Sequence, residues 1–435
     1  MTAALEKNGI GEIVKSFHET KFGEASEYRT KAIANFEQLG LPTNKSEEYR
    51  FTPITKAIAK NFEWKNNLSP SSISSIDQFL IDGIEATILV FVNGSYSQSH
   101  SKIDHSSKEI KITSLSEAFR ADKEVISKYF DKVSQSEADP FAAMNTAFWQ
   151  EGIFIHVSEN TKVERPILFL HISDANQEQV ITHSRLLLVV EKGSSLSVIE
   201  KFDSVGSNPI FQTLTEEIIV KENAQLEYYK IQNDSGNSHQ VTNTVIQQSN
   251  SSKVDTCTIT LNGQLVRNNF SIVIDGEHCE SHFHGLYLLN GNTIADNHTV
   301  VDHKKPNSFS NELYKGIMDG NSKGIFNGKI FVRPQAQKTN AFQSNRNILM
   351  SEDATVNTKP QLEIWADDVK CSHGCTSGQL DEEALFYLQT RGIPYDSAKA
   401  MLLYAFALDV LAPVKNEKLK VYLDSLIAER LNKNF

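Results

Sequence analysis

The spacing of hydrophobic residues changes twice along the chain. Near the start, Ile10, Ile13 and Phe17 recur at the spacing of one helix face, and helical spacing returns after about residue 378. Between them, from Ile153 to Leu362, short β-branched runs alternate with turns rich in Gly, Asn and Asp. The pattern therefore predicts a mainly β protein with α-helical ends.

Residues 1–150 read as a helical region with a small α/β lead-in. Helices are expected over residues 1–60, over Ser114–Phe130 and from Asp139 onward. Thr87–Val92 is a continuous apolar run typical of a buried strand. Asn66–Asp82 is polar and contains Pro and Ser, which predicts a connector.

The central region carries a weak repeat of apolar strand, polar turn and apolar strand. Turns follow Val190, Val220, Ile274, Met318 and Met350, at successive intervals of 30, 54, 44 and 32 residues. The longest interval is nearly two shorter units, with residues 248–251 as the turn between them. A repeat of this size without intervening helices favours a right-handed parallel β-helix over residues 151–378. An immunoglobulin-like sandwich also has many short strands, but it rarely needs two hundred residues of them.

Residues 379–435 form a helical tail. Asp381 is placed to cap the first helix and Gly392 to end it. Apolar stripes through Phe406 and through Leu423 predict two more helices. Each coil of a solenoid leaves apolar surface that must be covered, so the helical regions on either side are expected to cap the solenoid ends. The alternative is that the tail presents an exposed face to a partner.

Composition narrows the function classes. The formal net charge of −11 argues against a nucleic-acid partner, which would require a basic surface. No secretory pattern opens the chain and no apolar run could span a bilayer, so we expect a cytoplasmic protein with no membrane contact. Four cysteines in 435 residues do not form a disulfide framework, and Cys257 and Cys279 lie in strand-like runs as expected of small buried hydrophobes.

Cys371, His373 and Cys375 occupy alternate positions just before the helical tail. On a strand, alternate side chains share one face, and thiolate and imidazole are ligands suited to iron and iron–sulfur centres. Neighbours on one strand face are about 6.5–7 Å apart, so a flat strand cannot wrap all three around one ion unless Gly374 bends it. This geometry suits a line of ligands offered to a facing surface, and therefore an interface.

Two other stretches resemble known sites less well. Gly324–Ile330 is similar to a P-loop, but the glycine spacing is one residue short and Ile330 replaces the Ser or Thr that would hold magnesium. We therefore expect no nucleotide site in this chain. His282 and His284 share one strand face, as in a cupin-type metal site, but the downstream Glu is missing, which favours polar residues on a solvated face. His298 and His303 are interpreted as part of a turn region.

The segment around the Cys371 cluster also resembles a known family. The resembling residues include Thr358–Ile364, Ala366–Gly374, Phe386–Leu388 and Arg391–Ile393, with Ser310–Gly316, Phe326–Ile330, Leu39–Thr43 and Glu47–Arg50 upstream. The chain is identified by these residues as a member of the SufB/SufD family of iron–sulfur cluster assembly scaffolds, most similar to its SufD branch.

The resemblance implies a scaffold without catalytic activity of its own, in the SufD role of a SufB–SufC–SufD complex. His373 and Cys371 would be ligands for a transient cluster shared with a SufB-like paralogue at the subunit interface. Cys375 lies where SufD proteins commonly have a small residue, so the resemblance assigns it no role. A SufC-like ATPase would bind the tail, with Phe386, Tyr387, Arg391 and Phe406 as candidate contacts.

The sequence leaves several alternatives open. A β-solenoid enzyme acting on carbohydrate would show an export signal and clustered carboxylates along one face. A stand-alone metal-binding homodimer would hold its cluster without a SufB-like partner. Pairing of the isolated chain with itself and participation of a flavin are both compatible with these residues.

Overall fold

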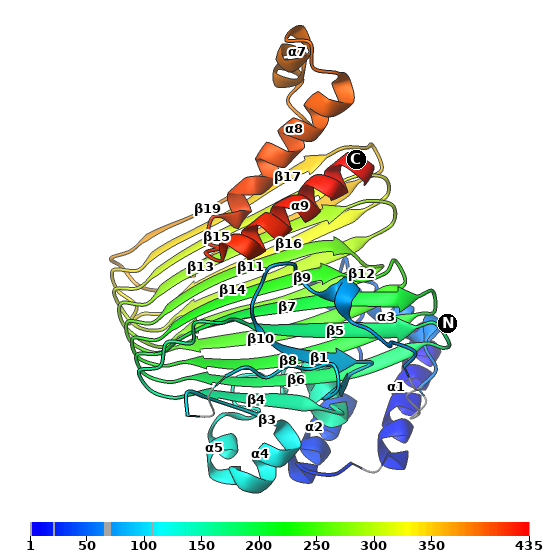
Figure 1. Ribbon diagram of the computed structural model, residues 1–435, viewed down its shortest axis with the longest axis vertical. Coiled ribbons are helices and arrows are strands. Elements are labelled where there is room, and N and C mark those ends of the chain that lie inside the picture. Colours follow the sequence, from blue (N-terminus) through cyan, green and yellow to red (C-terminus); the bar gives the residue numbers. More distant parts are fainter. Residues whose placement is uncertain (1, 21, 65–70, 106–107, 135, 435) are drawn as a thin grey trace.

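The computed structural model describes residues 2–20, 22–64, 71–105, 108–134 and 136–434. Its strands stack into two facing sheets, and each coil of the chain adds one strand to each sheet (Figure 1). One sheet has ten strands in the order β19-β17-β15-β13-β11-β9-β7-β5-β1-β2, and the other has nine in the order β18-β16-β14-β12-β10-β8-β6-β4-β3. Every pairing between β4 and the strands that follow it is parallel, so the predicted β-solenoid core is confirmed.

The strands have the following bounds: β1 (Thr87–Val92), β2 (Ser95–Tyr96), β3 (Ile110–Ser114), β4 (Gly152–Val157), β5 (Ile167–Ala175), β6 (Val180–Val190), β7 (Ser195–Gly206), β8 (Ile210–Val220), β9 (Gln225–Asn233), β10 (Ser238–Gln248), β11 (Lys253–Asn262), β12 (Leu265–Ile274), β13 (Glu280–Leu289), β14 (Ile294–His303), β15 (Phe309–Met318), β16 (Lys323–Val332), β17 (Asn340–Leu349), β18 (Thr355–Ile364) and β19 (Lys370–Gly378). The helices are α1 (Thr2–Glu19), α2 (Ser26–Leu39), α3 (Ile54–Asn61), α4 (Leu115–Ala121), α5 (Lys123–Tyr129), α6 (Pro140–Phe148), α7 (Glu382–Thr390), α8 (Tyr395–Leu408) and α9 (Glu417–Asn434), with short 3₁₀ turns η1 (Glu47–Tyr49), η2 (Asp77–Phe79) and η3 (Asp409–Leu411).

Most central strands are buried on both faces. On β9, Tyr228 points between the sheets, whereas its neighbour Tyr229 belongs to a second apolar cluster on the outer face of the ten-stranded sheet. Helices cover the outer faces of both sheets, α8 and α9 on the ten-stranded sheet and α2 and α6 on the nine-stranded one, so strands such as β5 and β8 are buried at every position. Parallel strands covered on both sides read as continuous apolar runs rather than as alternating ones.

One turn residue per coil adopts a left-handed backbone conformation. The column consists of Asn160, Gly193, Asn223, Ser251, His278, Asn307 and Lys338, all with φ between 55° and 69°. Backbone hydrogen bonds join successive members to the next turn, as from Asn223 N to Asn250 O at 2.9 Å. These turns connect the nine-stranded sheet to the ten-stranded one.

The repeat read from the sequence mixed two kinds of turn. The turns after Val190, Val220, residue 248 and Ile274 leave the nine-stranded sheet, whereas those after Met318 and Met350 leave the ten-stranded sheet. They lie at opposite ends of the strands, so the 44-residue interval spans one and a half coils. The expected regular repeat is therefore wrong at that step, because polar turns at both ends look alike in sequence.

The N-terminal helices lie on the outer face of the nine-stranded sheet. Phe36 of α2 and Phe141 of α6 pack in one cluster with Phe211, Val241 and Leu265 of that sheet. The first strands of the two sheets are bordered by antiparallel partners, β3 beside β4 and β2 beside β1. The solenoid is thus closed at its N-terminal end by short strands.

The single helix expected over Ser114–Phe130 is instead two helices. The break falls at Asp122, whose backbone leaves the helical region (φ −128°, ψ 35°). Asp122 also forms an ion pair with Lys111 of β3. The periodicity of apolar residues continues across the break, since α4 and α5 bury Leu115 and Ile126 in the same cluster, so the pattern alone does not reveal it.

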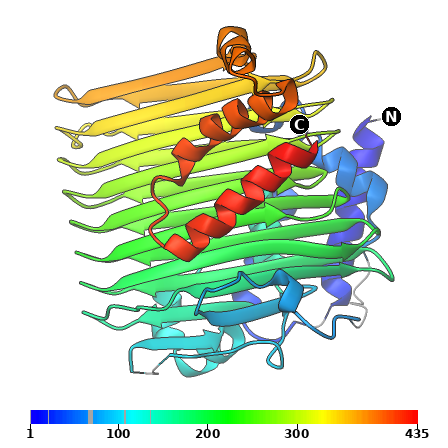
Figure 2. The same cartoon turned by 45° about the horizontal axis from the view of Figure 1, so that its top comes forward.

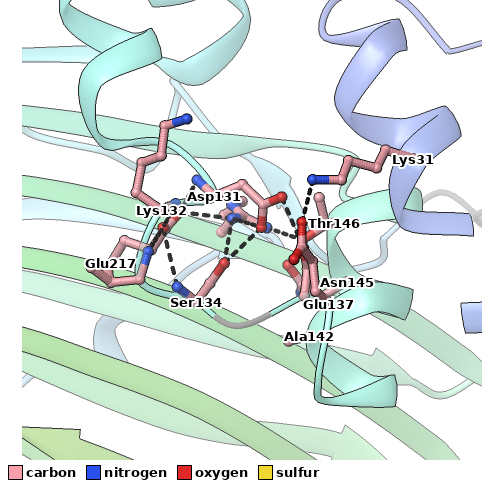
Figure 3. Close-up of polar contacts among 12 residues, drawn as sticks. Lys31, Asp131, Lys132, Ser134, Glu137, Ala142, Asn145, Thr146 and Glu217 are labelled. Atoms are coloured by element: carbon pink, nitrogen blue, oxygen red, sulfur yellow. Dashed lines mark hydrogen bonds and ion pairs between the residues drawn. The ribbon is translucent and has the colours of Figure 1, made fainter. Parts of the chain in front are cut away.

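A buried carboxylate fixes the N-terminal region to the solenoid. Glu217 of β8 accepts hydrogen bonds from the backbone N–H groups of residues 131–134, at 2.8 to 3.3 Å, and lies 2.7 Å from Arg185 Nη2 (Figure 3). The side chains of Arg185 and Glu217 are both fully buried. Arg185 also donates to Thr146 of α6 at 2.5 Å, so one ion pair ties the loop and the helix to the sheet.

The C-terminal helices do not cap the solenoid, contrary to the expectation. Helices α8 and α9 run across the outer face of the ten-stranded sheet (Figures 1 and 2). Tyr229 of β9 donates to Pro413 O at 3.2 Å, and Lys315 of β15 donates to Phe406 O at 2.8 Å. Their apolar stripes are thus used on the side of the solenoid, and its last coil remains uncovered.

The connector predicted over Asn66–Asp82 is described only from residue 71, so its first five residues lie outside the described part of the chain. Within the remainder, Ser72 N and Oγ donate to Asp174 at 2.6 and 2.7 Å, and η2 follows. None of the helices formed by the described residues is both long enough and apolar enough to cross a membrane.

Candidate functional site at the open end of the solenoid

The cysteine–histidine cluster lies on β19, the last strand of the ten-stranded sheet. Its register with β17 is unbroken from Lys370 to Gly378, so Gly374 does not bend the strand. Cys371, His373 and Cys375 pair with Ala341, Gln343 and Asn345, all of which are buried. Because facing residues of neighbouring strands project to the same side, the three ligand candidates point to the inner face of the last coil.

Within the described part of the chain, no further coil covers that inner face. His373 and Cys375 are exposed and Cys371 is half-buried against the inner core, whereas the equivalent residues one coil earlier are nearly inaccessible. The inner face of β19 is therefore open at the end of the solenoid, where a second molecule can reach it.

The cluster is incomplete as a metal centre. Opposite it, the inward positions of β18 are Val356, Thr358, Pro360 and Leu362, which offer no thiol, imidazole or carboxylate. Across the described ranges, no three His, Cys, Asp or Glu side chains gather closely enough to hold a metal ion. Burial raises the pKa of the Cys371 thiol, which disfavours the thiolate in the free chain. A metal or cluster here would need ligands from another source.

The unpaired edge of β19 carries backbone N–H groups that a partner strand could bind. Lys370 N donates to Thr339 O, just before β17, and successive residues of a strand direct their N–H groups to opposite edges. The N–H groups of Cys371, His373 and Cys375 therefore point away from β17, toward the free edge of the sheet. A partner strand that paired with this edge would therefore lie next to the side chains of the same three residues.

The N-terminal segment is fixed to the sheet opposite the cluster. Glu48 of η1 lies 2.5 Å from Lys329 Nζ and 3.2 Å from His298 Nδ1, and hydrogen bonds from these groups lower the pKa of its carboxyl to about 2. Glu47 forms an ion pair with Lys359 of β18. The Glu47–Arg50 stretch singled out in the sequence thus braces the last strands of the nine-stranded sheet.

The other sequence candidates are structural. His282 Nε2 lies 2.7 Å from Glu280, and His284 is buried, which lowers its pKa to about 4. His303 is buried and bonded to Ser310 at 2.9 Å, so it is a strand residue rather than part of a turn. Gly324–Ile330 lies within β16 and is paired on both sides, so it forms no phosphate-binding loop. Cys257 and Cys279 are buried, as predicted.

The candidate partner contacts of the tail divide into two groups. Phe386 and Tyr387 of α7 are 67% and 56% exposed, and the exposed Arg391 caps the C-terminal end of that helix. Phe406 of α8 is half-buried, and its ring lies 4.5 Å from Lys315 Nζ. Helix α7 projects beyond the last strands (Figure 1), so it lies near the open end of the solenoid.

Comparison with known proteins identifies the family. The description "SUF system FeS cluster assembly, SufBD core domain" matches residues 171–406, and "SufBD protein N-terminal region" matches residues 13–169. The chain belongs to the SufBD family. It is 30% identical to the iron–sulfur cluster assembly protein SufD of Escherichia coli and 27% identical to SufD of Bacillus subtilis, over 96% of both chains in each case. A SufBD family protein of Synechocystis is 30% identical over 86% of this chain and 84% of its own.

This SufBD protein is therefore a SufD-like member of an iron–sulfur cluster assembly family. Sequence reasoning found the Cys371 cluster but did not find the residues beneath it, Gln343 and Glu312, which share its face in the preceding strands. Their register becomes visible only when the strands are stacked, because the three positions are about thirty residues apart in the chain.

Proposed function

We propose that this SufBD protein is a non-catalytic scaffold subunit that takes the SufD role in a complex with a SufB-like paralogue and a SufC-like ATPase. A nascent iron–sulfur cluster, as cargo, would form where the open end of this solenoid meets the paralogue. His373 and Cys371 would provide ligands from this side, with the remaining ligands from the partner. The observation that best supports this proposal is the row formed by Cys371, His373 and Cys375, which points inward on the last strand and is not covered by another strand.

The geometry supports a shared cluster rather than a resident one. Three ligands on one strand face cannot surround an ion, and the facing strand β18 adds none. The free edge of β19 can pair with a strand of another chain, which would bring that chain's ligands over the same face. A polysaccharide-active enzyme is not favoured by any observation on this surface. The second candidate is a homodimer in which two copies pair through this same edge. Each copy would then supply an identical row of ligands.

The test is His373→Ala in the reconstituted three-subunit complex. His373 is exposed, so we expect the free energy of unfolding of the isolated chain to fall by only about 0.5–1 kcal/mol. Cluster formation, followed by its visible charge-transfer absorption, should be largely lost. His18→Ala, which removes an exposed histidine on α1, is the control. Normal melting together with normal cluster formation would remove His373 from the mechanism.

The ATPase would dock on α7. Phe386 and Tyr387 form an exposed apolar pair on a helix that packs little against the sheets, which is typical of a surface that a partner covers. Phe386→Ala together with Tyr387→Ala should weaken co-purification with the SufC-like ATPase, while pairing with the SufB-like subunit persists. Val421→Ala, at a position 62% exposed on α9, is the matched control. Unchanged ATPase binding in the double variant would place the docking surface elsewhere.

A further inference from the structure

A column of three polar side chains lies beneath the open end. Glu312 of β15 pairs with Gln343 of β17, and Gln343 pairs with His373 of β19. All three project to the inner face of the solenoid, and neighbouring strands are about 4.8 Å apart. Glu312 and Gln343 are 1% and 3% exposed, so they are buried directly below the exposed imidazole.

The amide of Gln343 is held in one orientation. Its Nε2 donates to Glu312 Oε2 at 2.7 Å, so its Oε1 must be the atom left as acceptor. Room for this amide comes from Gly328 on the opposite sheet, where an added Cβ would lie 2.3 Å from Gln343 Nε2. The space left by Gly328 and the hydrogen bond to the buried carboxyl of Glu312 together fix the side chain of Gln343.

The acceptor that remains has no partner in the conformation described here. Among the described residues, Gln343 Oε1 is buried and has no hydrogen-bond partner. A buried carbonyl oxygen without a donor is costly, and such an atom in a folded protein usually marks a function. The nearest side chain above it in register is His373, whose ring has one N–H to donate when its other nitrogen binds a metal.

We infer that Gln343 is a positioning residue for His373: the exposed imidazole turns inward from the conformation described here, its ring N–H donates to Gln343 Oε1, and Glu312 holds the amide so that Oε1 can accept. The bond selects one tautomer and directs the other ring nitrogen out of the open end, toward the cluster. This assignment deepens the proposed function and rests on it only for the identity of the ligand that His373 binds. Gln343 itself does not touch the cluster.

The tautomer of His373 tests the inference in the full, cluster-free chain. Long-range ¹H–¹⁵N spectra of histidine-labelled protein report which ring nitrogen carries the proton, and His373→Gln assigns the signal. In the native chain we expect one tautomer to dominate. Gln343→Leu should shift the tautomer ratio by about twofold to tenfold, the range of a hydrogen bond with a net value of about 0.5–1.5 kcal/mol.

Two further variants make the result specific. Gln361→Leu makes the same substitution on the outer face of β18 and should leave the His373 signal unchanged. If Gln343→Leu does not fold, as judged by thermal melting, Gln343→Met keeps the length of the side chain and removes the acceptor. A folded Gln343 variant with an unchanged tautomer ratio would overturn the inference.

The outcome is separable from that of the proposed function. If His373→Ala leaves cluster formation intact but Gln343→Leu shifts the tautomer, the positioning contact stands and the ligand role fails. If His373→Ala abolishes cluster formation and Gln343→Leu changes neither the tautomer nor the cluster, the ligand role stands and the positioning contact is refuted.

Discussion

One buried carboxylate, that of Glu217, joins the N-terminal region to the solenoid. Glu217 offers one carboxylate to four backbone N–H groups and to Arg185, and neither side chain of the ion pair reaches solvent. A charge so enclosed is stable only while its partner is present, because an unpaired ion in the interior is strongly disfavoured. The contact fixes residues 131–134 on the sheet, and nothing in the local sequence indicates it.

Glu217→Gln should lower the free energy of unfolding by about 3–5 kcal/mol, because it leaves the Arg185 guanidinium buried without its counter-ion. Urea denaturation followed by far-UV circular dichroism measures the change. Glu222→Gln provides the matched control, since its partner Lys192 and Glu222 itself are 52% and 45% exposed, and a surface pair contributes about 1 kcal/mol or less. Equal effects of the two substitutions would contradict the argument.

Glu312 should make stability depend on pH. Burial raises the pKa of its carboxyl from 4.5 to about 7. Between these values the unfolded chain has lost the proton and the folded chain retains it, so the stability that this group contributes falls as pH rises. The change amounts to about 3 kcal/mol over this range.

The Glu312→Gln variant cannot ionise at this position. Relative to the native chain, its free energy of unfolding should therefore rise by about 3 kcal/mol between pH 4.5 and pH 8. Asp234, which has a raised pKa for the same reason, is present in both proteins and cancels in the comparison. A difference between the two proteins that stays constant with pH would show that Glu312 ionises as it does in water.

At the level of strands and helices, the sequence predicts kinds of element better than their placement. A period of two shows that Cys371, His373 and Cys375 share a face, but it does not show which face, since that depends on the neighbouring strand. The helical stripes through Phe406 and Leu423 show that one side of each helix is buried. They do not show which surface the helices pack against. The tail was therefore expected to cap the end of the solenoid, whereas it packs on the side, against the ten-stranded sheet. Contacts between distant segments decide both questions.

Helix α9 should depend on its packing against the ten-stranded sheet. Leu423 is 1% exposed in the cluster that joins this helix to the strands, so Leu423→Ala should cost about 2–5 kcal/mol. Hydrogen exchange of the α9 amides should accelerate accordingly. Val421→Ala, two residues earlier on the exposed side of the helix, should change stability by less than about 0.5 kcal/mol. Similar exchange in both variants would mean that α9 does not rely on this face.

The molecule as a whole is asymmetric along its axis. The first strands are bordered by antiparallel partners, whereas β18 and β19 end the sheets without a neighbour among the described residues. An uncovered sheet edge is normally protected against association. Here the edge carries the ligand candidates, which is consistent with an end that is covered only in the assembled state.

Edge pairing can be tested with one proline. Residue 375 directs its N–H to the free edge, so Cys375→Pro should keep the bonds between β19 and β17 and remove one donor from the edge. Pairing with a SufB-like subunit, or with a second copy, should weaken about tenfold or more, as measured by light scattering after size-exclusion chromatography. Cys375→Ala removes the same thiol and should pair normally. Normal pairing of both variants would exclude strand addition as the mode of association.

The C-terminal crossing over the ten-stranded sheet limits how this fold can change in length. The tail is attached at Tyr229 on β9, at Cys257 on β11, through Cys257 Sγ and Val410 O at 3.4 Å, and at Lys315 on β15. Inserting a coil between β9 and β15 would move these attachment points apart by about 4.8 Å, the spacing of one strand. A coil inserted before β9 would leave them unchanged. Gains and losses of whole coils among descendants of this protein should therefore be rare between β9 and β15.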